Sequence, residues 1–231
     1  MVDLTEKAYL SELIRDFPPR KTIDVEDAWK QIQIRYSVLD ANKENYVSLA
    51  SIDKRPFNEI LLELAKRVHS FMFDNVLSNA GEFRKATDPH NGFVTFGPEL
   101  TRTAWGSKFK GTSPTQIDIE LKSAFAILSK EDHDPIRHSI LFYQKFVRIH
   151  PFYDANGRIA RFLLTLYLLH FGYYIRWKQL EESKKNEFLK KLNACHLREG
   201  TPSFEQYFGY LVEFWRRFIV KKSEFIEGEV I

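Results

Sequence analysis

One stretch of the chain constrains the fold more than any other, because it is apolar on nearly every side. Residues 159–170 read Ile-Ala-Arg-Phe-Leu-Leu-Thr-Leu-Tyr-Leu-Leu-His. A run of this length is long for a strand, and as a helix it has no polar face over its last nine residues. Such a helix must be surrounded by other elements. The sequence therefore predicts a central, buried helix here.

Most of the remaining chain has the period of amphipathic helices, with apolar residues three and four positions apart. The segments with this pattern are 5–16, 24–35, 58–77, 116–129, 136–148, 178–194 and 203–224. The stretch 82–98 differs, because turn-forming pairs such as Asn91-Gly92 flank a short Phe93–Phe96 run. We expect an all-α helical bundle around the central helix, with a small β-hairpin or ordered loop at 82–98.

Composition excludes several classes of protein. The 231 residues, 44% of them apolar, suit one globular domain. With 34 basic and 31 acidic residues the net charge of +3 is too small for a dedicated nucleic-acid binder. The lone Cys195 excludes an intramolecular disulfide and favours a reducing compartment. The most apolar window, 162–175, is too short to span a bilayer, and no secretory signal begins the chain. We expect a cytoplasmic protein without membrane or nucleic-acid partners.

The segment before the central helix carries the chemistry: His150-Pro-Phe-Tyr-Asp-Ala-Asn-Gly-Arg-Ile-Ala-Arg161. Pro151 disfavours helical geometry at His150, so His150 should stand where a helix meets a loop. Phe152 can pin this loop to the core. Asp154 or Asn156 can cap the following helix, and for Asp154 capping alone is a plausible explanation.

Capping does not explain Arg158 and Arg161. Cations in the first turns of a helix are unfavourable by about 0.3–1 kcal/mol each unless an anion lies between them and the exposed N–H groups. Asn156-Gly157 completes the cradle, because glycine lets backbone N–H groups approach a phosphate. The sequence thus predicts a polyphosphate site. Asp154 suits Mg²⁺, which combines one or two carboxylates with substrate phosphates, and His150 could accept a proton from an attacking hydroxyl. Together these residues describe nucleotidyl or phosphoryl transfer.

This segment resembles the signature of the Fic family, His-Pro-Phe-x-(Asp/Glu)-Gly-Asn-Gly-Arg-x-x-Arg, at eight of its nine fixed positions. The departure is Ala155 where glycine is usual, a replacement that we expect to be tolerated if its φ is negative. The resemblance implies a protein adenylyltransferase that moves AMP from Mg-ATP to a hydroxyl of a target protein. It also implies that His150 deprotonates the hydroxyl and Asp154 holds Mg²⁺. The nucleotide would be bound by the residues Asn156, Gly157, Arg158 and Arg161.

The likeness extends beyond the motif. Ala80-Gly-Glu-Phe-Arg84 is similar to a second Fic segment, and residues 85–99 take the place of the family's flap, a hairpin that aligns a target segment. Gly157 stands where phosphorylating relatives carry lysine, which favours AMP transfer. We expect a single Fic-fold domain over 1–231, made of an N-terminal helical addition (1–55), a Fic core (56–200) and a C-terminal helix (201–231).

Ser223-Glu-Phe-Ile-Glu227-Gly228 matches the inhibitory pattern Ser/Thr-x-x-x-Glu-Gly/Asn of Fic proteins. The resemblance implies autoinhibition, with Glu227 paired to Arg161 and Ser223 anchoring the helix; an ordinary charged tail would also fit the pattern. Two functions besides AMP transfer stay open. The chain could be a Fic scaffold that binds nucleotide or a partner without transferring a group, or it could transfer UMP or phosphocholine. The target protein is unknown, and homo-oligomerisation is possible.

Overall fold

The computed structural model describes residues 2–97, 109–129 and 134–224. Its α-helices are α1 (Val2–Asp16), α2 (Val25–Ala41), α3 (Lys43–Ile52), α4 (Phe57–Phe73), α5 (Ile117–Ala126), α6 (Pro135–Ile149), α7 (Asn156–His170), α8 (Trp177–Arg198) and α9 (Phe204–Arg216). Short 3-10 helices are η1 (Pro89–Gly92), η2 (Pro114–Gln116), η3 (Ile127–Ser129) and η4 (Lys222–Glu224). The strands are β1 (Thr95–Phe96), β2 (Phe109–Lys110), β3 (Tyr173–Ile175) and β4 (Ile219–Lys221). The fold is all-α, as expected.

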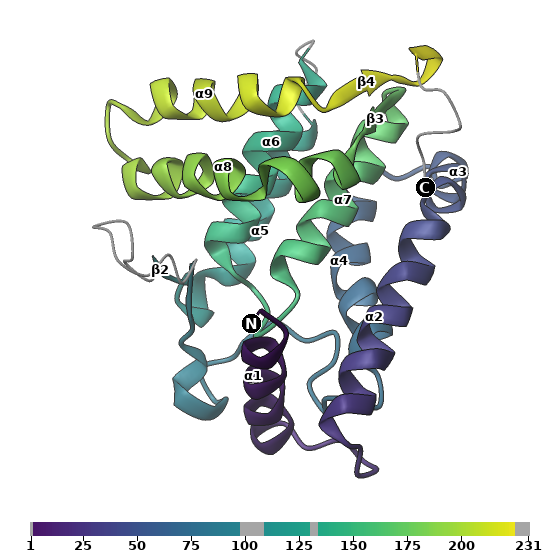
Figure 1. Cartoon of the computed structure of the whole chain (residues 1–231), viewed down its shortest axis with the longest axis vertical. Coiled ribbons are helices and arrows are strands. Elements are labelled where there is room, and N and C mark those ends of the chain that lie inside the picture. Colours follow the sequence, from purple (N-terminus) through teal and green to yellow (C-terminus); the bar gives the residue numbers. More distant parts are fainter. Residues whose placement is uncertain (1, 98–108, 130–133, 225–231) are drawn as a thin grey trace.

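Helix α7 is the predicted central helix. Leu163, Leu164 and Leu168 are completely buried on it, and α3, α4 and α6 pack around it. Helices α8 and α9 lie side by side and pack on α6 (Figure 1). Because the later turns of α7 are buried among these helices, its first turn is held in place and can carry a precisely placed site.

Helix α6 is the amphipathic helix predicted for residues 136–148. Its apolar residues pack against α5, α7 and α9, and Ile140, Phe142 and Phe146 are completely buried. Pro135 occupies its first position, and the Asp134 side chain accepts a hydrogen bond from the backbone N–H of Arg137 at 3.0 Å. Proline at the start and a carboxylate cap fix where this helix begins.

Two small antiparallel ribbons accompany the helices. The Phe93–Phe96 run supplies β1, but its partner β2 lies at Phe109–Lys110, with Phe96 opposite Phe109. The described partner of β1 thus lies outside the expected flap of 85–99, and residues 98–108 between the two strands fall outside the described part of the chain. The partner strand is only two residues long, too short for an alternating pattern that the sequence could reveal.

The end of the helical region also differs from expectation. The predicted helix 203–224 ends at Arg216, and Ile219–Lys221 forms β4 instead. This strand pairs with Tyr173–Ile175, which leaves α7 through Gly172 at a φ of 78°. Backbone hydrogen bonds between β3 and β4 stabilise the strand at 219–221 more than a continuation of α9 would. Helix α3, a short element within the N-terminal addition, was missed.

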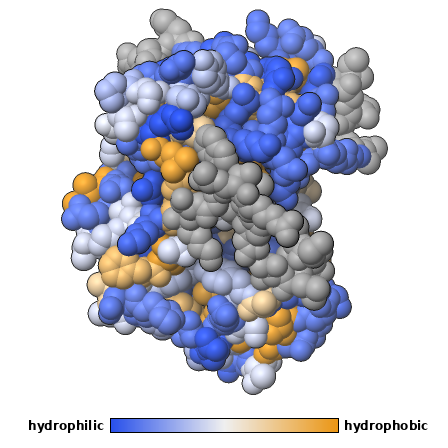
Figure 2. Space-filling model, turned by 60° about the vertical axis from the view of Figure 1, so that its left-hand side comes forward, coloured by the Kyte–Doolittle hydropathy of each residue, from blue (hydrophilic) through white to orange (hydrophobic). Residues whose placement is uncertain are grey.

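Figure 2 shows a face that is mainly hydrophilic, with its hydrophobic side chains in small separate groups. Within 2–97, 109–129 and 134–224, no helix is both long enough and apolar enough to cross a bilayer.

Candidate functional site

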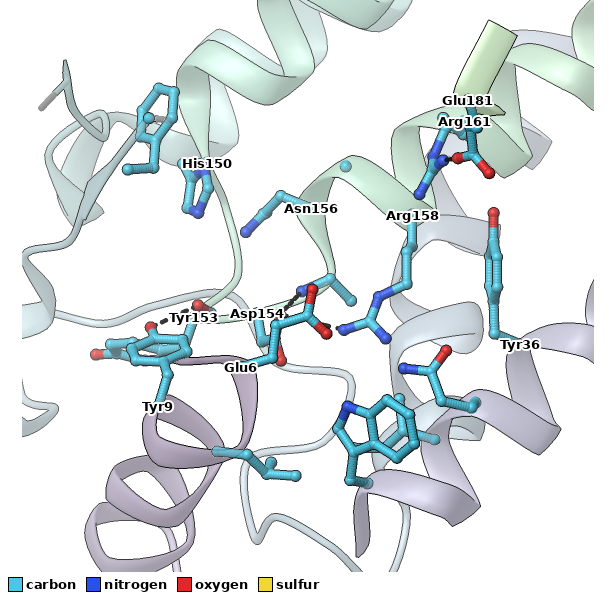
Figure 3. A pocket seen from close by; sticks show the side chains of 18 of the residues that line it. Glu6, Tyr9, Tyr36, His150, Tyr153, Asp154, Asn156, Arg158, Arg161 and Glu181 are labelled. Carbon is cyan, nitrogen blue, oxygen red and sulfur yellow. Dashed lines mark hydrogen bonds and ion pairs between the residues drawn. The ribbon is translucent and has the colours of Figure 1, made fainter. Parts of the chain in front are cut away.

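A cavity of about 750 Å³ opens where the first turn of α7 meets the N-terminal helices (Figure 3). Helices α1 and α2 form one wall, the loop 150–155 and β1 another, and the start of α8 closes the far side. Its lining includes every motif side chain expected to act: His150, Asp154, Asn156, Gly157, Arg158 and Arg161. In Figure 3 His150 lies on one side of the cavity and Arg161 on the other, with Asp154, Asn156 and Arg158 between them.

His150 stands at the junction of α6 and the loop, as predicted. Its backbone adopts a left-handed conformation, φ 54° and ψ 59°, so the chain reverses here instead of extending the helix. The following Phe152 is completely buried and stacks on His69, with ring centroids 4.2 Å apart. The expectation that Phe152 pins the loop to the core is confirmed.

The hydrogen bonding of His150 assigns its tautomer. Its Nδ1 lies 3.3 Å from the Val147 carbonyl oxygen. A carbonyl only accepts, so Nδ1 carries the proton and Nε2 keeps a lone pair. Burial lowers the pKa of His150 to about 4, although the bond to Val147 acts in the opposite direction. The imidazole is therefore neutral at pH 7, in the form that can accept a proton.

The first turn of α7 is open to an anion. No side chain caps this helix end, so the predicted cap by Asp154 or Asn156 is wrong. Asp154 accepts a hydrogen bond from the backbone N–H of Ala155 instead. Apart from its chain neighbours and the backbone of its own helix, no heavy atom lies within 4 Å of the position that a Cβ on Gly157 would take. Free N–H groups next to open space suit a phosphate group.

Asn156 braces the loop from inside. Its side chain is buried, accepts from the backbone N–H of Phe152 at 3.0 Å and donates to the Phe152 carbonyl at 2.8 Å. The amide is thus engaged within the loop, and the Asn156 backbone is the part that faces a ligand at the helix end.

Ala155 does not have the negative φ at which it would easily replace glycine. Its φ is 60°, in the left-handed region, where an L-residue costs about 1–2 kcal/mol. Glycine would avoid this cost. The strain persists because both bonds between Asn156 and Phe152 close the turn around this residue.

The two motif arginines have different partners. Arg158 lies 3.3 Å from Asp154, four residues earlier. Arg161 forms an ion pair with Glu181 in the second turn of α8, and its guanidinium lies over the ring of Trp177 at 5.6 Å (Figure 3). Glu181 was not identified from the sequence, because nothing in its local pattern distinguishes it from other exposed acids on an amphipathic helix.

The inhibitory motif is only partly described. Ser223 lies exposed in η4, where neighbouring Lys222 is 3.7 Å from Glu44 of α3. Glu227 falls outside the described residues. Among the residues that the structure describes, the carboxylate that pairs with Arg161 belongs to Glu181.

Two tyrosines from the N-terminal helices also line the cavity and were missed. The Tyr9 hydroxyl of α1 donates to the Tyr153 carbonyl at 2.7 Å. Tyr36 of α2 is half-buried; burial raises the pKa of its hydroxyl, and the nearby Arg161 partly offsets this rise. Their approach to the motif depends on tertiary packing, which no local pattern predicts.

Arg84 joins three separate segments behind the cavity. It is 2% exposed, and its guanidinium donates to four backbone carbonyls. The acceptors are His150 at 2.8 Å, Thr112 at 2.9 Å, Ile149 at 3.3 Å and Gly92. Burial lowers the pKa of this arginine. The end of α6, the loop before β1 and the segment after β2 are thereby tied together.

Asp154 is the motif side chain in the cavity that could bind a metal ion. In the part of the chain that the structure describes, no three His, Cys, Asp or Glu residues are grouped as metal ligands. Asp154 is nevertheless half-buried at the cavity, next to the open first turn of α7. One carboxylate beside a phosphate seat fits Mg²⁺, which takes its remaining ligands from phosphates and water.

Comparison with known proteins agrees with this geometry. Residues 59–168 match the profile of the Fic/DOC family. A protein adenylyltransferase fic-1 from Caenorhabditis briggsae is 30% identical over 113 residues, 48% of this chain and 22% of the relative. A protein adenylyltransferase Fic from Culex quinquefasciatus is 29% identical over 130 residues, 55% and 23% of the two chains. This chain thus spans less than a quarter of the length of either relative.

Solved structures show the same fold. An N-terminal Fic domain of a VirB-translocated Bep effector from Bartonella quintana superposes with a TM-score of 0.57 at 15% identity, over 89% of this chain and 88% of that one. A Fic domain containing signaling protein from Bacteroides thetaiotaomicron gives 0.54 at 20% identity, over 86% and 71%. Another Bartonella quintana Fic domain, with ADP bound, gives 0.54 at 13% identity, over 88% and 90%. Residues 59–168 of this chain thus match the Fic/DOC family, and its all-α fold is that of the solved Fic domains.

Proposed function

We propose that this protein transfers AMP from ATP to a hydroxyl side chain of a target protein. One observation carries the proposal. His150, with its proton on Nδ1 and a lone pair on Nε2, lines the same cavity as the open first turn of α7 and the two arginines beyond it. A base and a polyphosphate seat in one cavity are what nucleotidyl transfer to a hydroxyl needs. The adenylyltransferase names of the relatives support AMP as the transferred group.

In this reaction Nε2 of His150 accepts the proton of the target hydroxyl. The hydroxyl oxygen forms a bond to the α-phosphorus, and the bond from that phosphorus to the bridging oxygen of the β-phosphate breaks. Pyrophosphate then leaves with the two electrons of that bond. The N–H groups of Gly157 and Arg158 stabilise charge on the α-phosphate, and Arg158 and Arg161 stabilise the leaving group.

Asp154 is the residue that would hold Mg²⁺. When bound, the ion would neutralise phosphate charge during the transfer. Asp154 must then give up its contact with Arg158, which would free that guanidinium for the β-phosphate. The target segment would align along the flap formed by β1 and β2, whose two strands leave outer edges available for strand addition.

The position of a radioactive label on ATP tests the transferred group. With Mg²⁺ present, label on the α-phosphate should become covalently attached to protein, whereas label on the γ-phosphate should not. Lysate proteins and the enzyme itself serve as acceptors, and α-labelled UTP tests the base. Transfer from γ-labelled ATP would show a kinase instead. Absence of transfer from ATP and UTP, despite tight nucleotide binding, would overturn the proposal in favour of a binding module.

The ion pair between Arg161 and Glu181 is expected to slow AMP transfer. The Glu181→Gln variant should transfer AMP faster at low ATP, by roughly tenfold, because a terminal phosphate and Glu181 compete for one guanidinium. Initial rates measured across ATP concentrations check this. The Glu187→Gln variant, on the same helix but paired with Arg217 outside the cavity, is the control.

Glu227→Gln belongs in the same assay, since Glu227 is the inhibitory residue that the family resemblance implies. A larger gain from Glu227→Gln than from Glu181→Gln would assign the restraint to the C-terminal motif. If neither variant exceeds the Glu187→Gln control, competition for Arg161 does not limit the reaction.

A further inference from the structure

The flap places two aromatic rings beside His150. Phe96 of β1 and Phe109 of β2 stand opposite each other in the ribbon, with ring centroids 5.6 Å apart. The Phe96 ring lies nearly parallel to the His150 imidazole, at 4.4 Å and an angle of 11°. One face of the imidazole is therefore covered by a side chain that comes from another element.

His196 of α8 supports both rings from behind. Its ring meets Phe109 edge-on at 5.2 Å and Phe96 at 5.9 Å. It is 5% exposed, and its Nδ1 lies 3.2 Å from the amide nitrogen of the buried Gln144. Burial lowers the pKa of His196 to about 3, so it is neutral under the flap at pH 7. Edge contacts of this kind hold aromatic rings in a defined orientation.

We propose that Phe96 is a positioning residue for His150: its ring fixes the plane of the imidazole and keeps water from that face, while Phe109 and His196 hold it there. This role depends on the AMP transfer proposed above. A two-residue strand has few backbone bonds of its own, so these ring contacts supply much of the order at this point.

Desolvation by this stack is one source of the low basicity of His150. The charged groups that act on the imidazole are Arg84, which lowers its pKa, and Asp154, which raises it; His196 faces it as a neutral ring. Removing the Phe96 ring admits water to one face without changing any of these groups. The pKa of His150 should then move up from about 4 toward the ordinary value near 6.5.

The first test needs no catalysis. In nucleotide-free protein labelled at histidine Cε1, NMR titration should show the His150 pKa rising by about one unit or more in Phe96→Leu. The His150 signal is assigned by its loss in His150→Asn. Phe96→Tyr, which keeps a stacking ring, should retain the wild-type value. The control is Phe171→Leu, which changes a half-exposed phenylalanine at the end of α7.

The second test uses transfer rates. Phe96→Leu should lower kcat about tenfold at pH 7.5 with an ATP KM within about twofold of wild type, and Phe96→Tyr should restore kcat. The acidic limb of the kcat/KM profile should move to higher pH in Phe96→Leu. An unchanged His150 pKa in folded Phe96→Leu would overturn the positioning role. A shifted pKa with no transfer by any variant would support the stack and reject AMP transfer.

Discussion

Replacement of His150 by asparagine is expected to slow AMP transfer by about 10²–10⁴-fold, the range for loss of a general base. Asparagine is the informative substitution, because it tolerates the left-handed backbone found at this position but cannot accept a proton near pH 7. Binding of ATP should change little, since its phosphates would contact the first turn of α7 and the arginines. Single-turnover transfer and equilibrium nucleotide binding measure the two quantities separately.

His150→Ala is the companion variant. Alanine removes the same nitrogen but fits the left-handed backbone less well, so any additional loss of thermal stability would report on the turn rather than on the chemistry. Transfer by folded His150→Asn within tenfold of the wild-type rate would show that another group removes the proton.

Replacement of Arg84 by methionine is expected to lower the free energy of unfolding by about 3–5 kcal/mol, the cost of removing one partner from a buried charged network. Methionine fills a similar space but leaves four backbone carbonyls without the donor they now share. Urea unfolding followed by tryptophan fluorescence measures the change. AMP transfer should be lost as well, because the carbonyl of His150 is one of the four acceptors.

Two further variants sharpen this test. Arg84→Lys keeps the charge but cannot spread five N–H donors over three segments, so it should recover only part of the stability. Arg67→Met removes an arginine whose side chain is 72% exposed on α4, and it should cost less than about 1 kcal/mol. An Arg84→Met protein as stable as Arg67→Met would show that water or a shifted carbonyl compensates for the guanidinium.

The features that the sequence predicted are those determined by neighbouring residues. The absence of a polar face in 159–170 requires a central helix, and α7 is that helix. Pro151 ends α6, and Phe152 anchors the loop, each through a local property of its side chain. The spacing of Arg158 and Arg161 places both on one side of the first turns, where they line the cavity.

The features that were missed or wrong depend on distant segments. The segment that pairs with β1 is Phe109–Lys110, more than ten positions further along the chain. Strand β4 forms because β3 offers backbone bonds that a longer α9 could not use. Ala155 takes a positive φ because the Asn156 amide closes the turn around it, against the preference of alanine. Glu181 reaches Arg161 only after α8 has packed on α6. None of these contacts is indicated by a periodic pattern or a motif in the sequence.

The wall that α1 and α2 contribute to the cavity bears on how this protein should be handled in the laboratory. A fragment trimmed to the family-matched residues 59–168 would lose Tyr9 and Tyr36 on one side and Glu181 on the other. Its nucleotide seat would then open to bulk water on two sides. The smallest working unit is accordingly longer than the family-matched segment, because α1, α2 and α8 complete the cavity.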